Sequence, residues 1–223
     1  MGRSVSAIAR ELGDIGRDFY ARGWALGTSG NFSARVSQDP LRLAITASAV
    51  DKGAIRAAHV LVIDERAARL GKAGGRPSAE ALLHVTVARR RGAGAVLHTH
   101  SIWSTILSDL HAADGGLTLT GYEMLKGLEG VQTHEHAEWV PILENDQDMA
   151  RLASRVDATL EKHQSAHAFL LRQHGLYTWG DDLRQARRHV EILEFLFEAA
   201  GRRRELGGRH GTGENSGRAA NGQ

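Results

Sequence analysis

Apolar side chains recur with helical spacing near both ends of the chain. Residues 4–22 place their apolar positions on one helix face, and Gly23 follows as a helix-ending residue. Residues 182–204 show the same amphipathic spacing, with Val190, Leu193 and Phe197 on one face. The pattern therefore predicts one helix over 4–22 and a longer one over 182–204.

Between these helices, short apolar runs alternate with further helical segments. Strands are predicted at 41–46, 60–64, 95–100 and 168–174, and a turn-rich stretch from Trp24 leads into another strand near Val36. Helices are predicted over 78–91, where Ser78 is expected to cap the first turn, from Ser101 onwards, and over 147–163. Strands that alternate with helices indicate the α/β class.

Composition narrows the organisation and the location of the protein. The 223 residues, 42% of them hydrophobic, fit one domain, placed at 1–204, and the Gly-rich residues 205–223 are predicted to be a disordered tail. No apolar run approaches the roughly 20 residues that a membrane helix needs. The first residues lack the apolar core of a secretory signal. We therefore expect a cytoplasmic protein without a membrane partner.

Charge argues against a nucleic-acid partner. The net charge is only +2, and aromatic residues make up 5% of the chain. Two arginine clusters, 89–91 and 202–204, are interpreted as solvated helix ends.

Three histidines at the ends of predicted strands form a candidate metal site. His98 and His100 lie two apart, so a strand directs both imidazoles to one face, whereas a helix would separate them by about 200°. His174 ends a second apolar run and completes three ligands with one open position, the pattern of catalytic zinc. Cysteine is absent, so no thiolate competes, and other divalent metals also suit imidazole.

Other histidines leave alternatives open. His134 and His136 form a second His-X-His pair, a rival ligand set, but they lie in a charged stretch without a preceding apolar strand. The remaining histidines that we considered are interpreted as surface or packing residues. These are His59, His84, His111, His163, His189 and His210.

Three segments rich in small polar residues predict an anion pocket. Turns with exposed backbone N–H groups, hydroxyl side chains and a nearby cation suit a phosphate, although such residues are also common in ordinary turns. The candidate phosphate-binding residues are Ser29, Gly30, Asn31, Ser48, Lys52 and Ser78.

These motifs, in this order, resemble the class II aldolase and adducin family. The matching segments are 27–33, 45–48, 77–80, 98–101 and 173–176, within roughly residues 5–200. The resemblance implies a single domain with a central, largely antiparallel sheet flanked by helices. It also implies one Zn²⁺ per subunit, a small sugar-phosphate substrate, and a homotetramer with sites near subunit contacts. One departure is Ala49, where the family usually has glycine; alanine tolerates a positive φ poorly.

Within the family, a further block resembles the dehydratases of methionine salvage. It comprises residues 121–128, 133–136, 140–142 and 145–148. The resemblance implies loss of water from a methylthio-substituted ribulose phosphate, with the metal stabilising an enediolate. It makes Glu123 the expected acid/base, a carboxylate with a raised pKa, and Glu80 the alternative proton carrier. The rival functions are another sugar-phosphate aldolase or epimerase, or a non-catalytic scaffold like adducin.

Overall fold

Nine strands form one sheet in this computed structural model, which describes residues 4–71 and 74–209. The strand order is β4-β3-β2-β1-β5-β9-β8-β7-β6, and every neighbouring pair is antiparallel except β7 and β8. The bounds are β1 Asn31–Gln38, β2 Leu41–Thr46, β3 Val60–Ile63, β4 Arg69–Leu70, β5 Ala95–Thr99, β6 Gly116–Leu119, β7 Glu138–Leu143, β8 Ala168–Leu171 and β9 Gly175–Gly180. The predicted largely antiparallel sheet is confirmed.

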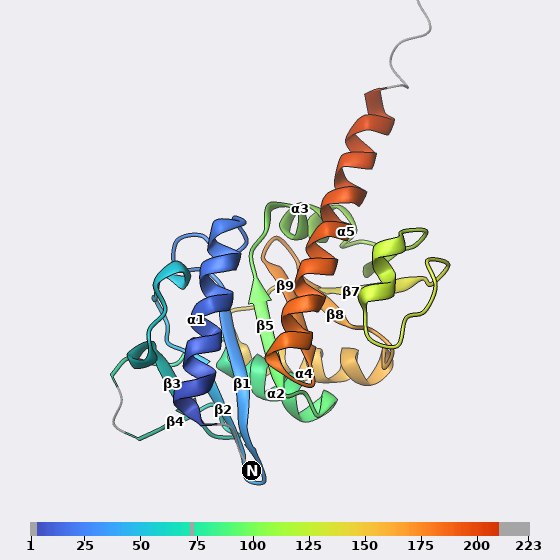
Figure 1. The fold of residues 1–223 in the computed structure, drawn as a ribbon. Helices are drawn as coiled ribbons and strands as arrows, with labels where there is room; N and C mark the ends of the chain where they lie inside the picture. The colour runs from blue at the N-terminus through green and yellow to red at the C-terminus, as the bar shows by residue number, and fades with distance from the viewer. Residues whose placement is uncertain (1–3, 72–73, 210–223) are drawn as a thin grey trace, which may run out of the picture.

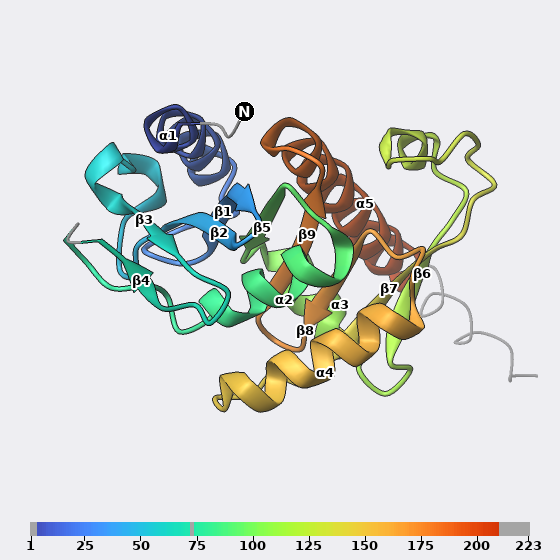
Figure 2. The ribbon, with the colours of Figure 1, turned by 90° about the horizontal axis from the view of Figure 1, so that it is seen from below.

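Helices cover both faces of this sheet (Figures 1 and 2). One face carries α2 and α4, and the other carries α1, α3 and α5. Side chains of β5 point alternately to the two faces of the sheet. Val96 belongs to the apolar cluster under α2, whereas Ala95 and Leu97 pack under α1 and α5. The helices are α1 Val5–Ala21, α2 Ala81–Arg91, α3 Ile102–Leu110, α4 Met149–Lys162 and α5 Leu183–Arg209; the short 3₁₀ segments are η1 Lys52–Ala54, η2 Ala57–His59 and η3 Glu123–Gly127.

The start of α2 differs from the prediction. Ser78 was expected to cap this helix, but its N-cap residue is Glu80 and the helix begins at Ala81. The segment before it is held extended, since Pro77 forms a β-bridge with Ala47 and the Ser48 N–H donates to Arg76 O at 2.9 Å. Ser78 Oγ accepts the Glu80 N–H at 3.3 Å instead. Glu80 is thereby placed at the junction of loop and helix.

Two C-terminal boundaries also differ. The predicted strand 168–174 ends at Leu171, and a tight turn then leads into β9, which the sequence pattern had not separated. Helix α5 continues past the predicted end at 204 to Arg209. The rest of the predicted tail, residues 210–223, lies outside the described residues, as do residues 72 and 73 of the predicted Gly/Pro loop.

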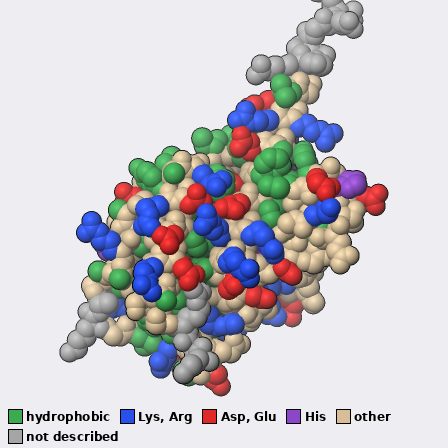
Figure 3. Space-filling model, viewed as in Figure 1, with side chains coloured by type: hydrophobic (Ala, Val, Ile, Leu, Met, Phe, Trp, Pro, Cys, Tyr) green, Lys and Arg blue, Asp and Glu red, His purple; other side chains and the backbone are tan. Residues whose placement is uncertain are grey.

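The surface over α1 and α5 mixes both signs of charge. Lysine and arginine side chains are interspersed with acidic ones over this face, and apolar side chains gather near α3 (Figure 3). The α3 residues Ile102, Ile106 and Leu110 are 70%, 42% and 47% exposed and lie on one helix face. None of the described helices is long and apolar enough to span a bilayer.

Candidate metal centre

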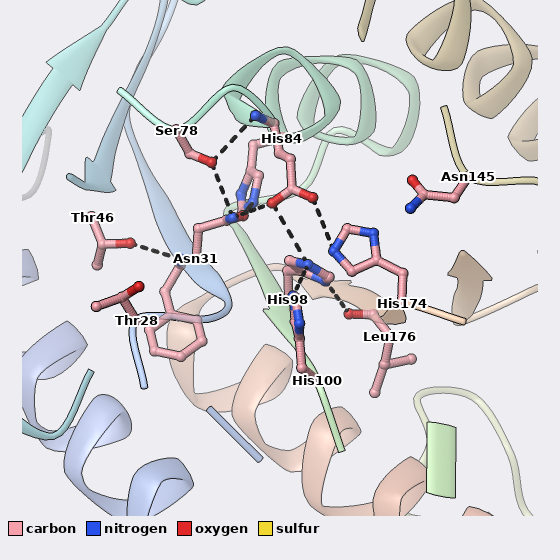
Figure 4. A network of polar contacts seen from close by, with 12 residues as sticks. Thr28, Asn31, Thr46, Ser78, His84, His98, His100, Asn145, His174 and Leu176 are labelled. Atoms are coloured by element: carbon pink, nitrogen blue, oxygen red, sulfur yellow. Dashed lines mark hydrogen bonds and ion pairs between the residues drawn. The ribbon is translucent and has the colours of Figure 1, made fainter. Parts of the chain in front are cut away.

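The candidate centre lies at one end of β5, the middle strand of the sheet. β5 pairs with β1 and β9, so that His98 stands opposite Asn31 on one side and Tyr177 on the other. His98 and His100 project to the same side, and their Nε2 atoms lie 2.8 Å apart. His174 reaches them from the turn between β8 and β9 (Figure 4). The structure thus brings together the three predicted ligands, whose nitrogens all lie within 4.8 Å of one another.

The protonation of these imidazoles suits a metal ion. His98 Nδ1–H donates to Leu176 O at 2.9 Å, which leaves the Nε2 lone pair directed toward the other two rings. Burial, reinforced by the neighbouring histidines, lowers the pKa of His98 well below 6.5 and that of His100 to about 4. Burial also lowers the pKa of His174. Neutral imidazole is the form that binds a metal, so the site fits a divalent cation.

The aromatic ring of Tyr177 packs against the imidazole of His98. Its ring stacks on that of His98 with centroids 3.9 Å apart, and Phe169 stacks on the opposite side of Tyr177 at 4.9 Å. Burial, with the charge of Glu80 nearby, raises the pKa of Tyr177 well above 10. Sequence reasoning missed this residue, although its place three residues after His174 in an apolar run was a usable signal. The stack fixes the orientation of the His98 ring.

Glu80 is the carboxylate that joins the triad. Its Oε1 lies 3.2 Å from His174 Nε2, and its Oε2 lies 3.7 Å from His98 Nε2. Asn31 Nδ2 donates to Glu80 Oε2 at 2.6 Å (Figure 4). The arrangement places a carboxylate beside the open side of three imidazoles, where it can either bind the ion or accept a proton from a ligand of that ion.

A buried histidine holds Asn31 in turn. His84 contacts Asn31 Oδ1 through Nε2 and the Ser33 hydroxyl through Nδ1, at 2.8 Å for the latter. Burial lowers the pKa of His84 to about 3, so this ring is neutral. We had interpreted His84 as a surface or packing residue; it is a packing residue with a defined polar role behind the site.

The three segments of the predicted anion pocket converge beside the triad. The Phe32 N–H donates to Thr46 Oγ1 at 3.1 Å, and Asn31 Nδ2 reaches Ser78 Oγ at 3.3 Å. Gly30 has φ +72°, and a Cβ there would lie 2.6 Å from His98 O, so only glycine allows this approach. Ala49 does adopt a positive φ, +59°, at the position where the family usually has glycine.

Lys52 is buried beside this pocket. Its Nζ donates to Thr28 O at 2.9 Å and Val50 O at 2.8 Å, and burial lowers its pKa to about 8. An ammonium has three donors, so one remains after these two backbone contacts. Asn31, by contrast, directs its amide to Glu80 and Ser78.

Glu123 lies apart from this cluster. It opens η3, its side chain is 72% exposed, and its polar contacts among the described residues are with Lys126 at 2.7 Å and His134 at 3.7 Å. The expected raised pKa is wrong for this chain, because the hydrogen bond from Lys126 lowers the pKa of Glu123. The rival pair does not converge either: His134 faces Glu123, whereas His136 Nε2 binds Glu138 at 2.9 Å.

We compared the sequence and the fold of this chain with those of known proteins. The profile of the class II aldolase and adducin N-terminal domain matches residues 10–200. A methylthioribulose-1-phosphate dehydratase from Pseudomonas aeruginosa is 47% identical over 199 residues, covering 89% of this chain and 95% of that protein. One from Sorangium cellulosum is 42% identical over 198 residues, covering 88% and 92%. The crystal structure of L-fuculose-1-phosphate aldolase from Thermus thermophilus aligns with a TM-score of 0.72 at 25% identity, covering 92% of this chain and 99% of that one. The chain belongs to the class II aldolase and adducin family.

Proposed function

We propose that this protein is the cytoplasmic dehydratase that removes water from 5-methylthioribulose 1-phosphate to give 2,3-diketo-5-methylthiopentyl 1-phosphate in methionine salvage. The observation that supports this proposal is the triad of His98, His100 and His174 with Glu80 beside it. The chain is also 42–47% identical, over most of its length, to proteins named methylthioribulose-1-phosphate dehydratase. A catalytically silent scaffold has no use for three converging neutral imidazoles.

The triad would hold one Zn²⁺ per subunit. Three histidines and an open position are the ligand set of catalytic zinc. When bound, the ion acts as a Lewis acid toward the substrate oxygens at C2 and C3 and makes the C3 proton more acidic.

Two carboxylates divide the proton transfers in this proposal. Glu80, beside His98 and His174, accepts the proton from C3. Glu123 donates a proton to the C4 hydroxyl, which leaves as water, and the resulting enol becomes the diketone. Hydroxide is a poor leaving group, so this second proton is needed.

The family resemblance implies a homotetramer, in which one subunit would supply the exposed Glu123 carboxylate to another. The apolar face of α3 begins two residues after His100, so a large exposed hydrophobic surface adjoins the triad. The phosphate would lie against the loops that carry Ser29, Gly30, Ser48 and Ser78, with the remaining Lys52 donor as its cation.

The test is to incubate the purified, zinc-loaded protein with 5-methylthioribulose 1-phosphate and follow the products by NMR. Dehydration gives the diketone. An aldolase would instead break C3–C4 and release dihydroxyacetone phosphate with methylthioacetaldehyde, and a scaffold would leave the substrate intact. Either of these results would refute the proposal.

A further inference from the structure

A second group of histidines and carboxylates lies away from the triad, around Glu138 at the start of β7. Glu138 is 1% exposed, and its carboxylate accepts three hydrogen bonds. His136 Nε2 donates at 2.9 Å, His167 Nδ1 at 3.0 Å and the His167 backbone N–H at 2.9 Å. A carboxylate buried this deeply requires a compensating positive charge.

The geometry identifies His167 as that charge. Its Nδ1 faces the Glu138 carboxylate and its Nε2 faces the Glu129 carbonyl oxygen at 2.8 Å. Both partners are pure acceptors, so both ring nitrogens carry hydrogen and His167 is an imidazolium. Burial alone would lower the pKa of His167, but the hydrogen bond to Glu138 and its charge outweigh burial and raise that pKa above 6.5.

The neighbouring ring of His189 shows the opposite state. His189 Nδ1–H donates to Trp179 O at 2.7 Å, while its Nε2 accepts the Glu129 N–H at 3.2 Å. This ring is therefore neutral, and burial lowers its pKa to about 4. The centroids of the two rings lie 5.5 Å apart. One histidine thus binds the carbonyl group of Glu129 and the other binds its N–H.

Glu129 belongs to the segment between β6 and β7, residues 120–137, which we call the excursion. It leaves the sheet as the yellow-green loop in Figure 1 and carries Glu123. The Glu129 carboxylate also accepts from Arg188 at 2.8 Å and Gln185 at 2.7 Å, both on α5. The backbone and the side chain of one residue thus tie the excursion to His167, just before β8, and to α5.

We propose that His167 and Glu138 form a protonation-dependent anchor that positions the excursion, and with it Glu123, for the proposed dehydration. His167 is a positioning residue, since it binds Glu138 and Glu129 and contacts no member of the triad. This role rests on the proposed function; the anchor itself does not. Among the described residues, the charged and titratable groups near His167 are Glu138, His136, Arg91 on α2, His189 on α5, Glu129 with its partner Arg188, and Asp181 in the lining of the adjoining hollow.

The sign of the pH effect follows from these partners. An imidazolium with a raised pKa keeps both hydrogen bonds below about pH 6.5 and loses one of them as pH rises through the raised pKa. A hollow of about 430 Å³, lined by His136, His167 and His189, gives water access to the rings. The anchor therefore weakens on the alkaline side, because Glu129 then keeps only its contacts with α5.

The experiment combines amide hydrogen exchange with steady-state kinetics, from about pH 6 to about pH 9, on the full-length zinc-loaded protein. In the wild type, exchange in residues 129–137, corrected for the intrinsic pH dependence of amide exchange, should rise, and kcat fall, through the His167 ionisation. His167→Asn keeps a donor toward Glu138 but loses the charge and the reach to Glu129 O. This variant should show fast exchange at every pH and a kcat lowered about 10- to 100-fold at neutral pH, with KM and metal content unchanged.

His111→Asn is the matched control. His111 also pairs with an acid, Asp114 at 3.3 Å, but on the surface, so its replacement should leave exchange and kcat as in the wild type. Glu138→Gln should lower the pKa of His167, which NMR of the imidazole protons measures directly. Corrected exchange in 129–137 that does not change with pH, or a His167→Asn enzyme with wild-type kcat, would overturn the anchor. A wild-type protein that does not dehydrate the substrate would overturn the proposed function while leaving the exchange result to decide the anchor.

Discussion

The triad region and the anchor region use the same side chains in opposite protonation states. Around Glu80 the imidazoles are neutral, because burial lowers the pKa of all three ligands and neighbouring imidazoles lower the pKa of His98 and His100 further. Around Glu138 the burial is similar, but one imidazole faces two acceptors and stays protonated. Burial alone therefore does not decide the charge of a histidine; the partner of each ring nitrogen does.

That difference separates two tasks. Lone pairs that converge on one point form a site for a cation, whereas an imidazolium between a carboxylate and a carbonyl joins two segments of chain. We expect changes in the first region to abolish chemistry, and changes in the second to alter how well the chemistry is positioned.

The largest effect should come from removing a triad ligand. His98→Ala should reduce the bound metal, measured by atomic emission, from about one ion per chain to a small fraction, and lower kcat by about 10³-fold or more. His136→Ala, the same change in the anchor region, should keep the metal. Loss of metal from His136→Ala with full retention in His98→Ala would reverse the assignment of the two regions.

The next largest effect should be the loss of kcat when either proposed proton carrier, Glu80 or Glu123, is replaced. Glu80→Gln and Glu123→Gln each keep the shape but cannot carry a proton, and each should lower kcat by about 10²- to 10⁴-fold. Glu123→Gln should retain metal, because Glu123 contacts no triad residue among the described part of the chain. A normal turnover number in Glu123→Gln would leave Glu80 as the sole proton carrier.

The free energy of unfolding should depend on pH with opposite signs through His84, behind the triad, and His167, in the anchor. In metal-free protein, the free energy of unfolding should fall by about 2–4 kcal/mol below pH 6.5, since buried His84, with a pKa of about 3, takes up its proton more readily when unfolded. His167 works the other way and contributes stability that is lost as pH rises through its raised pKa. Urea titrations of the wild type and His167→Asn measure both; an alkaline loss that persists in the variant would contradict this account.

The smallest effect concerns backbone strain. Beside the triad, Ala49 holds φ +59°, whereas the excursion uses a glycine, Gly121, at φ +79°. Ala49→Gly should relieve strain and change stability by at most about 1 kcal/mol in the stabilising direction, because the more flexible unfolded chain offsets part of the gain. A Cβ at Gly121 meets nothing within 4 Å, so Gly121→Ala isolates the conformational cost and should destabilise by about 1 kcal/mol. Equal urea midpoints for all three proteins would show that neither position is strained.

The sequence predicted those parts of the site that follow from local patterns. The period of a strand placed His98 and His100 on one face. A short apolar run indicated that His174 follows another strand, although His174 lies in the turn after β8 rather than at the strand's end. The antiparallel sheet and the family followed from motif order. The start of α2 was wrong, because the contact of Pro77 with Ala47 comes from another strand and leaves no local signal.

The residues that were missed depend on distant partners. Tyr177 matters because it lies opposite His98 on the neighbouring strand, and His167 matters because Glu138 and Glu129 surround it. Nothing within a few positions of His167 shows these contacts, and for Tyr177 the local signal is only its place three residues after His174 in an apolar run.

The central position of β5 determines when the site can form during folding. Its neighbours β1 and β9 come from opposite ends of the chain. The pairs Asn31–His98 and His98–Tyr177 therefore join residues that are far apart in the sequence, and each pairing must close a long loop. On the ribosome, His98 and His100 emerge well before His174, and the third ligand is in place only once β9 has paired. Uptake of a metal ion with full affinity thus marks the completion of the sheet, and a one-residue slip of β5 would turn both of its histidines away.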